Sequence, residues 1–181
     1  SSGEQIALKQ SGWGRDLPDL ANSPTSYSLS SALGTISDYT SNQLAYLKDF
    51  EIDYHQILKT PSLGDLLSAI DNLGSDVSVL RALSANNGGL VDAYDKVDAS
   101  PTDLVNRFAT SIAFFKNTLT PAQQTAILKF GAGSILLAYT PDETIDNTNV
   151  TASQRIIQLA DYFISLGTTD QQALRDMQVF S

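Results

Sequence analysis

The sequence contains no cysteine, and this absence removes several kinds of chemistry at once. Without thiols the chain cannot form a disulfide bond, a thiolate nucleophile or a cysteine-based metal site. A domain of 181 residues does not need such cross-links, because a chain of this size buries roughly 70% of its unfolded surface. An ordinary hydrophobic core is therefore expected to hold the fold.

Basic residues are scarce as well: 11 Lys and Arg stand against 20 Asp and Glu, for a formal net charge of −9. The basic side chains are scattered along the chain and form no cluster. A surface of this charge repels nucleic-acid phosphates and anionic lipid headgroups, so nucleic-acid binding is not expected. Long apolar runs are also missing. The longest is shorter than the ~20 residues that span a bilayer and is interrupted by Lys129, so no membrane-spanning helix is expected.

No stretch shows the alternation of apolar and polar residues that is typical of a β-strand. From Ser26 onward, apolar residues recur every three to four positions, in segments bounded by glycine, proline and Ser, Thr or Asp starts. This pattern predicts an all-α fold, an irregular bundle of about seven to nine helices. Residues 1–25, which glycine and proline interrupt, are expected to form an irregular lead, and residues 26–181 a single all-α domain.

The segment 121–139 is the expected centre of the bundle. Thr120 is placed to cap a helix, Pro121 sits where a missing N–H costs nothing, and Gln123 completes a capping box. From Ile127 on, the residues are apolar or small on nearly all sides, so a helix here must be covered on most sides. We therefore expect one buried central helix near 121–139, with the other helices packed around it.

A run of small residues, 131–134, leaves a bare patch on that helix. Two glycines inside a helix cost about 1 kcal/mol each relative to alanine, which the close approach of a neighbouring helix or of a ligand would offset. Several helices also carry aromatic faces, most of which are expected to lie in the core. If an apolar ligand binds between helices, its predicted contacts are Gly131, Gly133, Phe130, Tyr139 and Phe115.

The single histidine, His55, has no serine nucleophile marked near it, and its neighbours Asp53 and Tyr54 would lie on other faces of a helix. We interpret it as a surface or half-buried structural side chain. Trp13, between two glycines, is interpreted as an anchor that pins the lead segment to the body, with a partner contact as the alternative.

Two groups of acidic residues recur at close spacing: Asp92, Asp95 and Asp98, and then Asp142, Glu143 and Asp146. Neither group has the central glycine and terminal glutamate of a calcium-binding loop. They are interpreted as solvated faces and as acids placed at a helix start. No catalytic residue, metal site or cofactor is predicted, and the protein is expected not to be an enzyme.

Several features of the sequence favour an exported protein in the periplasm, a lumen or the extracellular space. The chain begins at Ser1 without a methionine or an apolar signal region, which is expected for a processed or trimmed chain. Lysine is scarce while Ser, Thr, Asn and Gln are plentiful. Asn149-Val150-Thr151 matches the acceptor pattern for N-glycosylation, although an unmodified loop is the favoured interpretation.

Two parts of the sequence resemble known families. The segment Leu119-Thr120-Pro121-Ala122-Gln123 resembles the LTxxQ motif of periplasmic helical stress chaperones of the Spy type. Residues 46–49, 52–54 and 68–71 resemble, in that order, a stretch of the all-helical peridinin–chlorophyll proteins. The second resemblance implies a carrier of a pigment-like molecule, but the paired histidines that this family uses near its chlorophylls are missing.

These patterns favour a non-enzymatic, exported helical binding protein that acts through protein–protein contacts. The first alternative is a carrier that holds an apolar or pigment-like small molecule between helices. The second alternative is a periplasmic chaperone-like stress protein.

Overall fold

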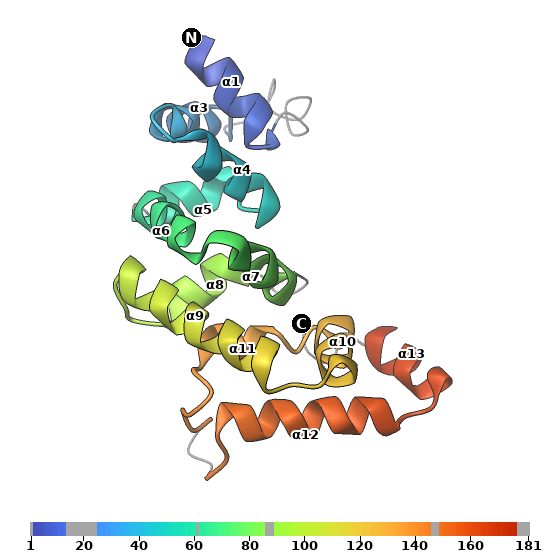
Figure 1. The fold of residues 1–181 in the computed structure, drawn as a ribbon. Coiled ribbons are helices and arrows are strands. Elements are labelled where there is room, and N and C mark those ends of the chain that lie inside the picture. Colours follow the sequence, from blue (N-terminus) through green and yellow to red (C-terminus); the bar gives the residue numbers. More distant parts are fainter. Residues whose placement is uncertain (1, 14–24, 61, 86–88, 146–148, 177–181) are drawn as a thin grey trace. The chain divides into compact units, whose positions relative to one another are not determined.

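The computed structural model describes the whole chain except residues 1, 14–24, 61, 86–88, 146–148 and 177–181. The described residues form helices and no strand (Figure 1). Their isolated β-bridge joins Thr144 to Thr151. The all-α, multi-helix fold predicted from the sequence is confirmed.

The helices follow one another with short links. From the N-terminus they are α1 (Ser2–Gln10), α3 (Thr25–Ile36), α4 (Ser41–Asp49), α5 (Tyr54–Lys59), α6 (Leu63–Ile70) and the 3₁₀ helix η2 (Asp71–Asp76). Then come α7 (Val77–Ser84), α8 (Gly89–Lys96), α9 (Pro101–Asn117), α10 (Pro121–Phe130), α11 (Ser134–Ala138), α12 (Ala152–Ser165) and α13 (Thr168–Asp176). The described residues thus hold more helices than the seven to nine expected, because segments expected to be continuous are interrupted.

Contacts between residues group the chain into two compact units, Ser1–Asn72 (unit 1) and Leu73–Ser181 (unit 2). In unit 1, α3 packs against α1 and α5, while α4 packs against α1 and α6. In unit 2, α10 packs along α12, and α11 contacts several helices. The expectation that residues 26–181 behave as a single domain stays a prediction.

The N-terminal lead is partly helical, whereas the sequence predicts an irregular lead over residues 1–25. Residues 2–10 form α1 despite Gly3, because the helix buries Ala7 and packs on α3 and α4. Trp13 follows α1 and is only 4% exposed, and its indole N–H donates to the carbonyl oxygen of Ile52 at 2.9 Å. The interpretation of Trp13 as an anchor is confirmed. Residues 14–24 of the expected lead lie outside the described residues.

Helix starts follow the expected local pattern closely. A capping box, in which side chain and backbone bond reciprocally, begins α4, α5, α10 and α12. The box of Thr120 with Gln123, predicted from the sequence, is confirmed, and Thr151 with Gln154 forms the same arrangement at the start of α12. Each box satisfies two N–H groups that a helix start leaves without a partner.

The segment 121–139 is not one helix, so this part of the sequence prediction is wrong. Helix α10 ends at Phe130, and Gly131 adopts a left-handed conformation with a φ of +71° at its C-cap. A short turn then leads into α11 at Ser134. Glycine adopts this conformation without the steric penalty of a Cβ atom, so Gly131 ends the helix where an apolar pattern alone would continue it.

The buried centre of unit 2 is the second half of that segment. Helix α11 contacts α7, α8, α9 and α12, and its Leu136 and Leu137 are 1% and 2% exposed. Helix α10 is instead buried along one face, since Thr125 and Lys129 are exposed while Ile127 is fully buried. The other helices therefore pack around α11 rather than around the whole of residues 121–139.

Gly133 allows this arrangement because the α7 backbone lies directly against it. A Cβ atom at position 133 would be 2.6 Å from the carbonyl oxygen of Leu83 and 2.9 Å from its Cα. Both distances are too short for any side chain, and both atoms belong to backbone that cannot swing away. The predicted close approach of a neighbouring helix to the small-residue patch is confirmed at this position.

We predict that Gly133→Leu lowers the free energy of unfolding by about 1–3 kcal/mol, because the new side chain would force α7 and α11 apart. Urea denaturation followed by far-UV circular dichroism measures this change. Gly34→Ala in α3 is a matched control, since no atom lies within 4 Å of the added Cβ. The control should be neutral or stabilising by up to about 1 kcal/mol. Equal stability of the Gly133 variant and the wild type would contradict the close contact.

Candidate functional site

The five residues predicted to contact a ligand lie in different surroundings. Phe130 stacks on Phe163 with ring centroids 4.2 Å apart, and Phe115 is only 6% exposed. Gly131 ends α10, and the space over Gly133 is filled by Leu83. Tyr139, the fifth residue, is half-buried at the end of α11 and lines a pocket. The carrier role stays a prediction, but the bare patch at Gly133 is used for helix packing.

The Tyr139 pocket lies in unit 2 and has a volume of about 400 Å³. Its walls come from the end of α8, from α9, from the end of α11 and from the segment that leads to α12. The lining residues are Lys96, Val97, Arg107, Ala138, Tyr139, Glu143 and Thr144. The pocket therefore combines an aromatic and aliphatic wall with three charged side chains.

A bidentate ion pair forms one side of this pocket. The Nη1 and Nη2 atoms of Arg107 donate to Oε1 and Oε2 of Glu143, both at 2.7 Å. Nη2 also donates to the carbonyl oxygen of Ala138 at 3.3 Å, and the N–H of Thr140 donates to Glu143 Oε2 at 2.8 Å. The Nε atom of Arg107 is buried and has no hydrogen-bond partner among the described residues. The pair thus joins Glu143, in the segment after α11, to Arg107 of α9, which lies 36 residues earlier in the sequence.

These bonds shift the ionisation of Glu143. The hydrogen bond from Arg107 lowers the pKa of the Glu143 carboxyl below its ordinary value of 4.5, against the raising effect of desolvation. The bond from Thr140 and the charge of Arg107 add to the lowering. The Arg107 and Glu143 side chains are 26% and 40% exposed, so solvent screens much of this interaction.

We predict that Glu143→Gln destabilises the protein by about 1 kcal/mol or less at pH 7, because it removes a partly exposed ion pair. A carboxyl whose pKa is lowered by folding contributes stability above its unfolded value near 4.5, and this contribution is lost as the pH falls through the folded value. The gap between wild type and variant should therefore shrink below pH 4.5.

Urea denaturation at several pH values measures this gap. Asp142→Asn is the matched control, since Asp142 is an exposed acid in the same segment. A control that loses as much stability as Glu143→Gln would contradict a specific role for the pair, and so would a gap that stays constant with pH.

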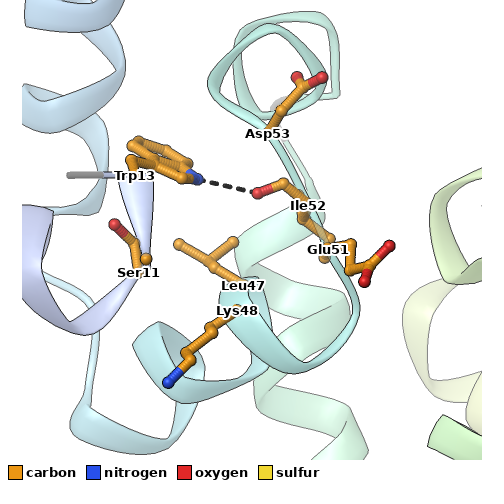
Figure 2. A pocket seen from close by; sticks show the side chains of 8 residues that line it. Ser11, Trp13, Leu47, Lys48, Glu51, Ile52 and Asp53 are labelled. Atoms are coloured by element: carbon orange, nitrogen blue, oxygen red, sulfur yellow. Dashed lines mark hydrogen bonds between the residues drawn. The ribbon is translucent and has the colours of Figure 1, made fainter. Parts of the chain in front are cut away.

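A second pocket, of about 260 Å³, surrounds the Trp13 anchor in unit 1 (Figure 2). Its charged lining residues are Lys48, Glu51 and Asp53. Figure 2 shows these three side chains pointing away from one another. Asp53 is also occupied, because its Oδ1 accepts the N–H of Gln56 at 2.9 Å as the cap of α5. We interpret this pocket as a gap beside the anchor, without converging functional groups.

Glu51 adopts a left-handed φ of +55°, which is uncommon for a residue other than glycine. Its position explains this conformation. The N–H of Ile52 donates to Leu47 O at 2.8 Å and the N–H of Glu51 donates to Lys48 O at 3.3 Å, which is the Schellman pattern of a helix end. The left-handed conformation of Glu51 is therefore part of the C-terminal end of α4 and gives no evidence for a functional site.

The single histidine and the first acidic group singled out in the sequence lie on the surface. The side chain of His55 is 52% exposed with Nδ1 3.8 Å from Asp53 Oδ1, which confirms the interpretation of a surface histidine. Asp92, Asp95 and Asp98 are exposed. In the described part of the chain, no group of three or more His, Asp or Glu side chains is arranged to hold a metal ion. Asp146 lies outside the described residues.

Two exposed apolar side chains stand out on α12. Tyr162 and Ile164 are 55% and 46% exposed and lie on either side of the fully buried Phe163. Leu159 is half-buried and lies on the side of Tyr162, at a helical spacing of three residues. Leu166, also half-buried, follows α12 as its extended C-cap. Ile164 is apolar and follows the buried Ala160 by four residues, yet it is largely open to solvent. The apolar surface of α12 is therefore wider than its contact with α10 requires.

Comparison with protein-family models, with curated proteins and with solved structures gives no match. Across the described helices, none combines the length and apolar character that crossing a bilayer requires.

Proposed function

We propose that the protein is a non-enzymatic helical binding protein that makes protein–protein contacts through the flanks of α12. The flanks are the two sides of α12 that carry Tyr162 and Ile164, next to its buried face of Ala152, Ile156, Ala160 and Phe163. The observation that supports this proposal is the exposure of Tyr162 and Ile164. Single exposed apolar residues are normal on a protein surface. Here two large ones flank one turn of a helix and adjoin the half-buried Leu159 and Leu166.

The chemistry of these flanks suits a protein partner. Tyrosine buries a large apolar ring while its hydroxyl remains able to hydrogen-bond, and it is enriched at protein interfaces. Leu159 and Tyr162 have the three-residue spacing with which a helix presents apolar anchors to a groove or to another helix. Burying such a side chain contributes about 1.5–3 kcal/mol, which is enough to anchor an interface.

The flanks are also well supported from beneath. Phe163 stacks on Phe130 of α10, and Gln123 donates to Asp161 at 2.8 Å. At the end of α12, the amide of Gln171 donates to the carbonyl oxygens of Phe163 and Leu166 at 2.9 Å and 3.1 Å. A partner would meet a surface that is already in place, which limits the entropy lost on binding.

The proposal includes export to the periplasm, a lumen or the extracellular space. Its support is compositional: the absence of cysteine, the scarcity of lysine and the abundance of Ser, Thr, Asn and Gln. The chaperone-like alternative rests on the LTxxQ resemblance, whose Thr120 and Gln123 already serve as a capping box.

We predict that a photo-crosslinking residue at position 162 or 164 captures a discrete polypeptide when the protein is placed in an extract of its own source. The same residue at Gln158, an exposed polar position on α12, is the matched control. Denaturing gel electrophoresis and mass spectrometry identify the adducts. Ile164→Glu should remove the adduct formed at position 162 and leave the circular dichroism spectrum unchanged. Equal adducts at all three positions, or none at 162 and 164, would refute the proposal.

A further inference from the structure

The Tyr139 pocket is an open hollow with a mixed polar and apolar lining, and its size is that of a small-molecule site. Its volume of about 400 Å³ falls within the roughly 300–1,000 Å³ that such sites occupy. Val97, Ala138 and Tyr139 supply aliphatic and aromatic surface, and Thr144 supplies a hydroxyl group. An organic molecule with an apolar body therefore fits this wall better than a bare ion does.

The charges around the pocket select the polar group of such a molecule. The guanidinium of Arg107 is matched by the Glu143 carboxylate, so these two charges offset each other. Lys96 is exposed at the end of α8 and makes no ion pair within the described residues. The charge available to a ligand is thus a single ammonium group, which suits a group with a single negative charge.

From this arrangement we propose that the Tyr139 pocket binds a small monocarboxylic acid, with its carboxylate at Lys96 and its apolar body against Val97, Ala138 and Tyr139. This site lies apart from the α12 flanks in sequence and uses different chemistry, so it goes beyond the protein–protein contacts proposed above. The acid is identified by its class: one carboxylate attached to an aromatic or short aliphatic body.

Acidic neighbours oppose this binding and supply a way to test it. Asp92 precedes Lys96 by one turn on the same face of α8, and its negative charge weakens the attraction between Lys96 and an anion. Removing the charge of Lys96 and removing the charge of Asp92 should therefore change the affinity for a carboxylate in opposite directions. Neither change should alter the affinity for a neutral molecule of the same shape.

Sodium benzoate and benzyl alcohol are the matched charged and neutral probes. Titration of the isotope-labelled full chain, followed by amide chemical shifts at constant ionic strength, should give saturable shifts at Val97, Ala138 and Thr144 with benzoate. Lys96→Gln should weaken benzoate binding about threefold to fivefold, and Asp92→Asn should strengthen it about twofold, as expected for exposed charges. Binding of benzyl alcohol should change by less than about 1.5-fold in either variant.

Lys59→Gln, at an exposed position in unit 1, is the control for a general loss of positive charge and should leave benzoate binding unchanged. The substituted side chains are exposed, and circular dichroism verifies that each variant is folded. Absence of saturable shifts at the pocket would overturn the proposal, as would charge substitutions that affect both probes equally. Neither result bears on the crosslinking experiment at α12, so the two proposals stand or fall separately.

Discussion

The close contact between the backbones of α7 and α11 at Gly133 is the constraint on which unit 2 depends. Helix α11 has five residues, too few for a helix to be stable in water by itself. It remains helical because α7, α8, α9 and α12 cover it, and Gly133 lets α7 approach without a side chain between the two backbones. The apolar side chains of α11 then fill the space at the centre of these four helices.

This buried helix also determines where the two candidate surfaces lie. The end of α11 positions Ala138 and Tyr139 beside Arg107 of α9, and the bond from Arg107 to Glu143 holds the chain that leaves α11. That chain leads to α12, whose inner stripe packs on α10 while its flanks remain open. One packing arrangement thus places a mixed polar and apolar pocket at one end of α11 and an apolar surface on α12.

Local patterns could be predicted from the sequence, and contacts distant in sequence could not. The capping boxes at Thr120 and Thr151 follow from residues three positions apart, and the close approach at Gly133 follows from small size. The break at Gly131 could not be predicted, because glycine fits both a helix interior and a left-handed cap. The Arg107–Glu143 pair joins residues 36 positions apart and leaves no periodic signal. The exposure of Ile164 likewise depends on which neighbour covers α12.

Hydrogen exchange at the amides of α11 tests the central role of this helix most directly. The N–H of Leu136 donates to Gly133 O at 2.9 Å and the N–H of Tyr139 donates to Ile135 O at 3.0 Å, both within the covered segment. If α11 is the buried centre, these amides exchange among the slowest in unit 2 and far more slowly than those of the largely exposed α13. Exchange at Leu136 as fast as in α13 would contradict the account.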